Sequence, residues 1–471
     1  MVCLGLHALQ HRGRDGAGVA VADGARIRHH RGLGSISDVF GPPQLASLVG
    51  HAAIGHVSGS SIGDDLLEQS QPFCASYPDG QAAIVHHGNL INAAVLRDEL
   101  ERAGSIFQTD MDTEVVLHLM ARSRQGTLVN RLVDALMQVE GSYSMLLLTK
   151  NTMVAVRDPH GYRPLVLGRN GRTWVVASET CALDLVGASF EREVEPGEMV
   201  IIDNDGLQSL RPLPRREPKS CIFEHLYFAR PDSQVRGRSA YSARLELGQR
   251  TALEHPVDAD VVMPIMASGT ASAIGYAQGS GTPYQMGLTR LHEVTGTRVG
   301  VAKSVLDAGA RLWYAPVQDV VSGKRVVVVD ELCPSATTMR TIVRMLRESG
   351  AEEIHVRITA PPTTGSSEHG NDAPNTDALT VRPMQVDDFR EFLGADSLGY
   401  LSLEGLFAVE GSDRGHFCEA CFPEEYVGEA AAGWGRRQVP LFVRQAMEAS
   451  MEMVPSHTNE RDAAIIPRDQ D

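Results

Sequence analysis

The pattern of apolar and polar positions divides the chain into two parts. Up to about residue 212, short β-rich runs alternate with turns that contain Asn, Gly and Pro. The clearest runs are SYSMLLLTK (142–150), NTMVAVRD (151–158), YRPLVLGRN (162–170) and TWVVASE (173–179). A helix is predicted over residues 92–104, after the strand AAIVHH, and it ends on Gly104. This part is therefore predicted to be mixed α+β.

From about residue 221 the pattern changes to strand, loop, helix. The strand ADVVMPI leads into a helical run over residues 267–281, and RVVVVDE leads into a helix over 337–350 and then a strand over 352–360. This alternation is typical of an α/β domain in which helices cover a parallel sheet. The Pro- and Arg-rich segment LRPLPRREPKS between the two parts is predicted to be a linker.

These patterns predict four segments. At 471 residues and 43% hydrophobic content the chain can bury two cores. We predict one domain over residues 1–212 and a second over 221–410. Residues 411–454 hold a CxxC pair and an amphipathic stretch, and residues 455–471 read as a polar, disordered tail.

Charge and cysteine content narrow the classes of partner. The formal net charge of −16 disfavours nucleic-acid binding, which depends on lysine and arginine. No apolar run reaches membrane-spanning length, and the first residues lack the layout of a secretory signal. Seven cysteines spread over the chain favour reduced thiols or metal ligands over disulfides. We expect a cytoplasmic protein with a small-molecule or protein partner.

Two strand-to-helix turns are candidate phosphate sites. Asp330 and Glu331 end an apolar strand, and Thr337 and Thr338 begin the next helix. Backbone N–H groups at a helix N-terminus bind phosphate, and the acids could accept hydrogen bonds from sugar hydroxyls. The plainer alternative is a helix cap beside two solvated acids. Ser268, Gly269 and Thr270 form a second turn of the same design.

Several longer segments carry a family resemblance. They are RDPHGYRPLVLGR (157–169), VASETCALDLVGA (176–188), VEPGEMV (194–200), CIFEHLYFARPDS (221–233), SGT before AIGYA, and VVVVDE before TT. Together they resemble glutamine phosphoribosylpyrophosphate amidotransferases. The resemblance implies an N-terminal-nucleophile glutaminase domain of αββα layers followed by a type I phosphoribosyltransferase domain. It further implies that ammonia from glutamine attacks phosphoribosylpyrophosphate in purine synthesis, with Mg²⁺ accompanying the phosphoribosyl substrate.

The family's glutaminase nucleophile, a cysteine at the mature N-terminus, has no match here. In the family it opens a strand ahead of the helix that ends in LQHRG. Residues 1–9 already correspond to that helix, so the sequence predicts that the first strand is missing. Cys3 falls within the helix and is predicted to be a packing residue.

The rest of the glutamine site is partly retained. Ser58 stands where the family has the arginine that holds the glutamine carboxylate, and His87 stands where an asparagine forms half of the oxyanion hole. Gly88, the other half, is present, as are Arg12 and Asp112, which the resemblance assigns to glutamine binding. Retention of these residues is expected if only the packing of the fold is maintained, and equally if the site still binds glutamine.

The phosphoribosyl site also departs from the family. Ser335 and Ala336 replace an arginine and a glycine of the phosphate turn, and Pro334 removes an N–H donor. Further replacements are Met266 and Ala267 before SGT, Leu291, His292 and Glu293 in the catalytic flap, and Trp313 for a lysine. Loss of cations weakens stabilisation of a departing pyrophosphate.

Three cysteines suggest a metal site. Cys221, Cys418 and Cys421 match three of the four thiolates that hold an iron–sulfur cluster in one branch of the family. The fourth position falls near Ser367, with His369 close by in the sequence. Iron–sulfur and zinc both suit such thiolates, and a relic set of reduced thiols is the alternative.

These departures predict a catalytically degenerate relative that acts as a binding or regulatory partner. It would form a homo-oligomer, or a hetero-oligomer with an active homologue, and could retain binding of phosphoribosylpyrophosphate or a purine nucleotide. The rival is an active enzyme that makes 5-phosphoribosylamine from glutamine or ammonia, with a mis-assigned start. A third possibility is new chemistry in the altered phosphate turn.

Overall fold

The computed structural model of the chain describes residues 1–59, 67–77, 80–290, 311, 313–333, 336–363, 386–411 and 414–422. All of them fall in the compact unit Met1–Tyr426.

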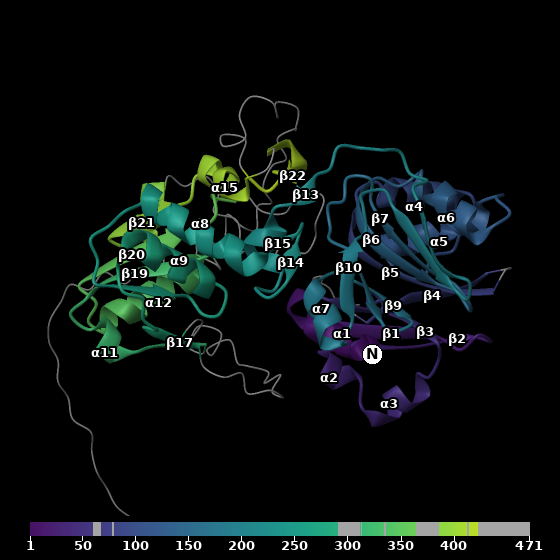
Figure 1. Cartoon of the computed structure of the whole chain (residues 1–471), viewed down its shortest axis with the longest axis horizontal. Coiled ribbons are helices and arrows are strands. Elements are labelled where there is room, and N and C mark those ends of the chain that lie inside the picture. Colours follow the sequence, from purple (N-terminus) through teal and green to yellow (C-terminus); the bar gives the residue numbers. More distant parts are fainter. Residues whose placement is uncertain are drawn as a thin grey trace, which may run out of the picture. The chain divides into compact units, whose positions relative to one another are not determined.

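The described residues of the first part of the chain form three sheets and seven α-helices, with a 3₁₀ helix over Gln10–Arg12 (Figure 1). The helices are α1 (Val2–Ala8), α2 (Ile36–Val39), α3 (Pro42–Ser47), α4 (Ala93–Arg102), α5 (Asp112–Arg122), α6 (Leu128–Leu136) and α7 (Thr180–Leu185). The strands are β1 (Gly16–Ala22), β2 (Ile27–Leu33), β3 (Ala52–Ser58), β4 (Phe73–Tyr77), β5 (Gly80–Leu90), β6 (Gly141–Leu148), β7 (Met153–Arg157), β8 (Val166–Asn170), β9 (Thr173–Ala177), β10 (Ser189–Glu193), β11 (Met199–Asp203) and β12 (Gly206–Leu210). The sheet orders among these described strands are β2-β1-β3, β10-β8-β9 and β12-β11-β7-β6-β5-β4.

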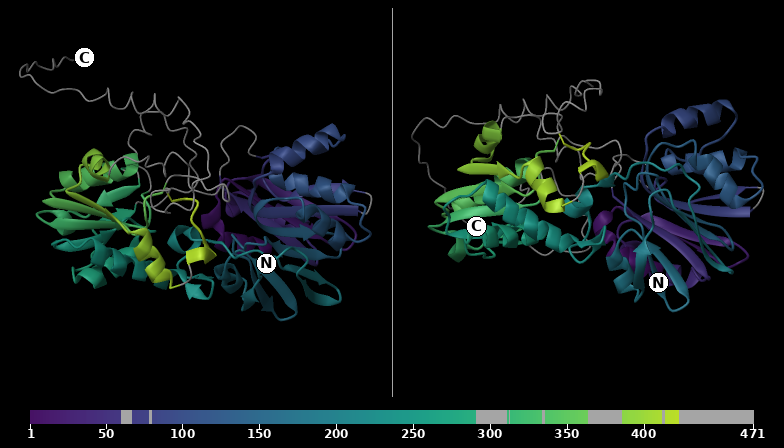
Figure 2. Two further views of the ribbon diagram at one scale, coloured as in Figure 1. Left: turned by 90° about the horizontal axis from the view of Figure 1, so that it is seen from above. Right: turned by 45° about the horizontal axis from the view of Figure 1, so that its top comes forward.

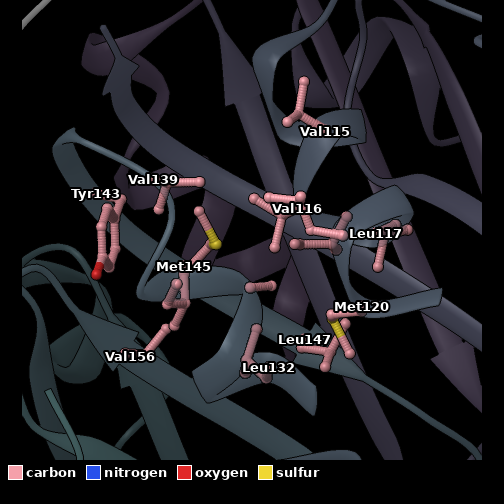
Figure 3. Close-up of a cluster of buried hydrophobic side chains, with 14 of the residues drawn as sticks. Val115, Val116, Leu117, Met120, Leu132, Val139, Tyr143, Met145, Leu147 and Val156 are labelled. Atoms are coloured by element: carbon pink, nitrogen blue, oxygen red, sulfur yellow. The ribbon is translucent and has the colours of Figure 1, made fainter. Parts of the chain in front are cut away.

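These elements stack in four layers, which two further views show from other directions (Figure 2). Helices α4, α5 and α6 cover one face of the six-stranded sheet, and Figure 3 shows Val116 and Met120 of α5 packed near Met145 and Leu147 of β6. On the other face, Ile54 of the first small sheet packs with residues of β5 and β6, and the second small sheet packs with β7 and β11. Helix α1 covers the first small sheet from outside, and α7 packs against both small sheets. The predicted αββα arrangement is confirmed.

The second part is an α/β domain built on a parallel sheet of order β16-β19-β20-β21. Its strands are β16 (Val261–Pro264), β17 (Leu288–Arg290), β18 (Tyr314–Pro316), β19 (Arg325–Asp330), β20 (Glu353–Ile358) and β21 (Ser397–Tyr400). Its helices are α8 (Ala240–Glu254), α9 (Thr270–Ser280), α11 (Gln318–Val321), α12 (Ala336–Glu348), α14 (Val386–Leu393) and α15 (Leu403–Glu410). Short strands β13 (Ser220–Cys221), β14 (Gln234–Val235), β15 (Arg238–Ser239) and β22 (Phe417–Cys418) lie outside that sheet.

Strand β19 shows why its sequence is apolar throughout. Val327 and Val329 pack towards α8 and α9, whereas Val326 and Val328 pack towards α12 and α14. Both faces of a parallel sheet are covered by helices, so a central strand needs apolar side chains at successive positions. The predicted parallel sheet is confirmed, and Asp330 is the last residue of its second strand.

The predicted boundaries of the four segments stay predictions. The amphipathic stretch and the polar tail lie outside the described residues.

Candidate functional site

A cavity of about 540 Å³ in the first part brings together residues that are far apart in the sequence. Its lining includes Arg12 after α1, Ser58 at the end of β3, His87 and Gly88 on β5, and Asp112 at the start of α5. Every glutamine-site residue that the sequence proposed therefore lies on one cavity. Their roles in glutamine binding remain predictions.

Backbone geometry requires glycine at position 88. Gly88 has a φ of 146°, which favours glycine strongly, and a Cβ there would lie 2.1 Å from the carbonyl oxygen of Ser142. No side chain fits without a shift of β6. The residue is thus fixed by packing of the sheet, whatever its role in chemistry.

Asp112 is anchored at the N-terminus of α5. The N–H of Leu90 donates to Asp112 Oδ2 at 2.9 Å, and His86 Nδ1 lies 3.4 Å from Oδ1. Burial alone would raise the pKa of Asp112, but His86 and these hydrogen bonds hold it below the ordinary value. The carboxylate is therefore ionised at neutral pH, as a ligand amino group would require.

Arg12 is tied to two buried carboxylates. Its Nε donates to Glu179, and its Nη2 and Nη1 donate to the two carboxylate oxygens of Glu224 at 2.5 and 3.2 Å. Burial would raise the pKa values of Glu179 and Glu224, but the guanidinium lowers both below their ordinary value. The positive charge of Arg12 is thus compensated by these two buried carboxylates.

Sequence reasoning missed these two carboxylates. Glu179 also accepts hydrogen bonds from the N–H of Arg230 (2.8 Å) and the hydroxyl of Ser233 (2.7 Å). The segment around Glu224 is therefore fastened to the wall of the cavity. Both acids lie within the family-like segments VASETC and CIFEH, which were the available signal, but their pairings with Arg12 span 167 and 212 residues.

The second candidate site lies at the carboxyl end of β19. Asp330 and Glu331 are 3% and 1% exposed, so the alternative of a solvated strand end is wrong for both acids. Ser268 Oγ donates to Asp330 Oδ1 at 3.1 Å, which joins the two predicted turns. The Nε of Arg244 on α8 lies 3.2 Å from Glu331 Oε1.

Burial raises the pKa of Asp330 to about 7 and that of Glu331 to about 8. Two hydrogen bonds lower the first value in part, and Arg244 lowers the second in part. A large share of both groups is therefore protonated near neutral pH.

The N-termini of helices α9 and α12 flank these acids. Gly269 precedes α9, and a Cβ there would lie 2.5 Å from the carbonyl oxygen of Val329. Thr270 donates to the carbonyl oxygen of Ala267 at 3.0 Å. Thr337 and Thr338 lie in the first turn of α12, with Thr337 exposed. The other altered positions of the turn and the flap, Pro334, Ser335, Leu291, His292 and Glu293, lie outside the described residues.

Two of the three predicted metal ligands are neighbours. Cys221 and Cys418 are directly paired in the parallel ladder between β13 and β22. Burial raises the pKa of Cys221 to about 11, which disfavours a thiolate unless a cation is present. Among the described residues, no three His, Cys, Asp or Glu side chains are close enough to hold one metal ion. Ser367 and His369 lie outside the described residues, so the predicted cluster stays a prediction.

Comparisons with known proteins define the class of protein. A family model for a glutamine amidotransferase domain matches residues 58–185, and one for a phosphoribosyl transferase domain matches residues 252–391. The chain thus joins a glutamine amidotransferase domain to a phosphoribosyltransferase domain.

Individual relatives identify the family. Amidophosphoribosyltransferase 2, chloroplastic, of Arabidopsis thaliana is 48% identical over 425 residues, which cover 90% of this chain and 76% of the relative. Amidophosphoribosyltransferase of Mycobacterium tuberculosis is 43% identical over 434 residues, which cover 90% of this chain and 82% of the relative. The chain belongs to the amidophosphoribosyltransferase family.

Solved structures agree with this assignment. The B. subtilis glutamine phosphoribosylpyrophosphate amidotransferase complexed with ADP and GMP superposes with a TM-score of 0.85 at 41% identity, covering 92% of this chain and 95% of that one. A structure of the allosteric regulatory enzyme of purine biosynthesis has a TM-score of 0.86 at 42% identity, covering 92% and 94%. Within the described part of this chain, no helix is long and apolar enough to cross a membrane.

Proposed function

We propose that this amidophosphoribosyltransferase homologue is catalytically degenerate and acts as a binding or regulatory partner. The observation that carries the proposal is the lining of the 540 Å³ cavity. It offers the short hydroxyl of Ser58 and the imidazole of His87 where glutamine chemistry calls for a cationic anchor and an amide donor. Arg12 does not replace the anchor, because Glu179 and Glu224 already match its charge.

The acid pair of the second site supports the same proposal. A Mg²⁺ complex of phosphoribosylpyrophosphate needs ionised oxygen ligands near the phosphates. Asp330 and Glu331 are the residues that would hold the ion, which would neutralise charge on the departing pyrophosphate. Without a bound cation, burial raises the pKa of Asp330 to about 7 and that of Glu331 to about 8, so Mg²⁺ would have to displace protons there and compete with Arg244, which already accompanies Glu331.

An active enzyme is the second candidate, favoured by the 48% identity to a named amidophosphoribosyltransferase. In that reaction the nitrogen of ammonia attacks the anomeric carbon of phosphoribosylpyrophosphate. The carbon–oxygen bond to pyrophosphate breaks, pyrophosphate leaves with the electron pair, and the new ammonium loses a proton. Glutamine or free ammonia could supply the nitrogen.

Glutamine affinity tests the first site. We expect titration calorimetry to detect no glutamine binding by the native chain at millimolar glutamine. The double variant Ser58→Arg with His87→Asn restores the anchor and the amide, and should bind at least about tenfold more tightly. The matched control, Ser58→Lys with His87→Asn, adds the charge without the bidentate fork and should gain less. Tight binding by the native chain would contradict degeneracy at this site.

The partner role can be measured separately. A mixture with an active amidophosphoribosyltransferase should sediment as a mixed oligomer, whereas this chain alone should form a homo-oligomer or remain a monomer. Purine nucleotides are the ligands to titrate, because the solved B. subtilis relative holds ADP and GMP. Independent sedimentation of the two proteins, with no change in the active enzyme's rate, would contradict the regulatory role.

We further propose that Cys221, Cys418 and Cys421 hold an iron–sulfur cluster with a structural role, which requires the three thiols to come closer together than they are in this structure. Support comes from the adjacent pairing of Cys221 with Cys418. Protein purified without oxygen should contain iron and acid-labile sulfide, and the Cys418→Ser variant should lose both. The Cys74→Ser variant, altered in β4, is the matched control and should retain them.

A further inference from the structure

Strands β20 and β21, which lie side by side in the parallel sheet, carry a line of hydrogen-bonded polar side chains (Figure 1). His355 on β20 is the register partner of Ser397 on β21. The Nδ1 of His355 lies 2.9 Å from the Oγ of Ser397, and its Nε2 lies 3.0 Å from Oε2 of Glu353. Neither candidate site described above includes these three residues.

The partners of these side chains determine where the protons lie. The carboxylate of Glu353 accepts, so Nε2 of His355 carries the proton of that hydrogen bond. The Nη1 of Arg357 donates to Ser397 Oγ at 2.9 Å, so the hydroxyl proton of Ser397 points to Nδ1 of His355. A serine nucleophile needs such an unprotonated base and a third group that orients the base. All three groups are present here.

The charge state of His355 suits a base. Burial, followed by the positive charge of Arg357, lowers the pKa of His355 below its ordinary value of 6.5, although Glu353 and Asp396 raise it in part. The imidazole is therefore neutral at physiological pH and can accept a proton.

Arg357 places a buried positive charge beside the serine oxygen. The residue is 3% exposed, and two of its other hydrogen bonds go to the carbonyl oxygens of His255 and Val356. Within the described part of the chain, no carboxylate forms an ion pair with it. Its charge is thus available to stabilise negative charge that develops on Ser397 Oγ.

The serine can be reached from solvent, but only by a small molecule. Ser397 is partly exposed, and the side chain of Glu353 is 48% exposed, whereas that of His355 is 6% exposed. Both a carboxylate and a guanidinium lie close to the serine, so neither sign of charge on a ligand is clearly favoured. An uncharged electrophile of a few atoms fits these conditions best.

We propose that Ser397 is a nucleophile that small acyl esters acylate, with His355 as its general base. The Oγ of Ser397 attacks the ester carbonyl carbon while Nδ1 of His355 takes the hydroxyl proton. A carbon–oxygen bond to Ser397 forms, and the bond to the alcohol breaks. The alcohol leaves with the electron pair and takes the proton from Nδ1, which leaves an acyl-serine and a neutral imidazole. This activity goes beyond the proposed function and does not depend on it.

Acetylation by 4-nitrophenyl acetate tests the proposal. After an acid quench, mass mapping of peptides from the native chain should find an acetyl group on Ser397, and Ser397→Ala should lose the matching release of nitrophenol. Sustained release that Ser397→Ala abolishes would mean that water hydrolyses the acyl-serine, which also supports the proposal. Ser402 is the matched control, because its hydroxyl donates to Glu254 at 3.0 Å and not to an imidazole. Acetylation confined to amines, or equal at Ser397 and Ser402, would overturn the proposal.

Two further variants separate the chemistry from the packing. His355→Gln removes the base and should slow acetylation of Ser397 about 100-fold. Because His355 is buried, that variant could lose its fold, so Glu353→Gln is the second variant. Its amide oxygen still accepts from Nε2 on a side chain that is about half exposed, and only the negative charge is lost.

The pH dependence shows whether Glu353 is a positioning residue that acts through His355. In the native chain, acetylation of Ser397 should rise with pH through a midpoint below 6.5 and should be level above about pH 7.5. Glu353 raises the pKa of His355, so Glu353→Gln should move the midpoint to lower pH. The control Glu352→Gln, at the exposed preceding position, should leave it unchanged. Acetylation that does not change between pH 5 and 7.5, or one midpoint for all three proteins, would overturn the role of His355.

Discussion

The two candidate sites treat buried carboxylates in opposite ways. At the first site, Glu179 and Glu224 share the guanidinium of Arg12, and their pKa values lie below the ordinary range. At the end of β19, Asp330 and Glu331 lie side by side, and their pKa values rise to about 7 and about 8. Residue type and depth of burial are similar, so the placement of the partner cation decides which acids stay ionised.

This difference separates the acids that stabilise the fold from the acids that could contact a ligand. The paired acids fasten the segment after the linker to the cavity wall and are already compensated. The acids of the second site are only partly compensated, by Arg244 and by the hydroxyl of Ser268. A cationic ligand or metal ion would therefore change the second site more than the first.

The largest effect is expected from breaking the compensated pair. Arg12→Ala removes the guanidinium that Glu179 and Glu224 share and leaves them with His11, 2.6 Å from Glu179, and Arg163, 3.5 Å from Glu224, which should lower the free energy of unfolding by about 3 kcal/mol. Urea denaturation followed by circular dichroism measures it. The control Arg124→Ala, on an exposed loop, should stay within about 0.5 kcal/mol of the native chain. Similar small losses for both variants would mean that the pair is not structural.

A second prediction concerns the backbone that shapes the first site. Gly88→Ala should lower the free energy of unfolding by about 3 kcal/mol, because a Cβ meets the carbonyl oxygen of Ser142 and φ is positive. Gly104 is the matched control, since its φ is also positive, at 93°, but no atom lies within 4 Å of its Cβ. Gly104→Ala should cost about 1 kcal/mol. Equal losses would show that strain in φ, and not the clash, dominates.

A third prediction uses pH to separate the two kinds of acid. Native Asp330 keeps its proton up to about pH 7, whereas unfolded Asp330 loses it near 3.8, so its contribution to stability falls as pH rises. From about pH 5 to pH 7, Asp330→Asn should therefore gain about 2 kcal/mol relative to the native chain.

For Glu179→Gln, we expect stability relative to the native chain to change with pH in the opposite direction. The pKa of Glu179 is lowered on folding, so its contribution is present above the ordinary value of 4.5 and is lost as pH falls. The variant should be less stable at neutral pH and should approach the native chain in acid. Chemical denaturation at several pH values measures both slopes, and slopes of the same sign would remove the difference between the two sites.

The smallest effect is expected at the helix start beside the second site. If this turn binds phosphate, the double variant Thr337→Val, Thr338→Val should weaken binding of phosphoribosylpyrophosphate or a purine nucleotide about fivefold, through lost hydroxyl hydrogen bonds. The control Thr341→Val is one turn further along α12, where the hydroxyl donates to the carbonyl oxygen of Thr337. Unchanged affinity for every ligand would exclude this turn as a binding site.

Much of the architecture was predictable because local patterns carry it. The periodicity of the apolar residues and the turn residues predicted strands β6 to β9 and the alternation of strand and helix around β19. The family resemblance assigned Arg12, Gly88 and Asp112 to one site, and all three line one cavity. The contacts that set the charge state were not predictable. Arg12 meets Glu224 across 212 residues, and Arg244 reaches Glu331 only because α8 packs beside the sheet.

A cavity of about 870 Å³ lined by residues of β3 and β9 shows the same limit, because no local pattern in the sequence brings these two strands together. Which residues share a cavity depends on how the layers stack, and that stacking is a tertiary property.

Pyrophosphate release from phosphoribosylpyrophosphate is the measurement that tests catalytic degeneracy most directly. Protein purified without oxygen and shown to be folded is supplied in parallel with glutamine and with ammonium, beside an active homologue as the positive control. We predict no release above background with either nitrogen source. Release with ammonium alone would contradict degeneracy of the phosphoribosyl site, and release with both would contradict the interpretation of Ser58 and His87 as well.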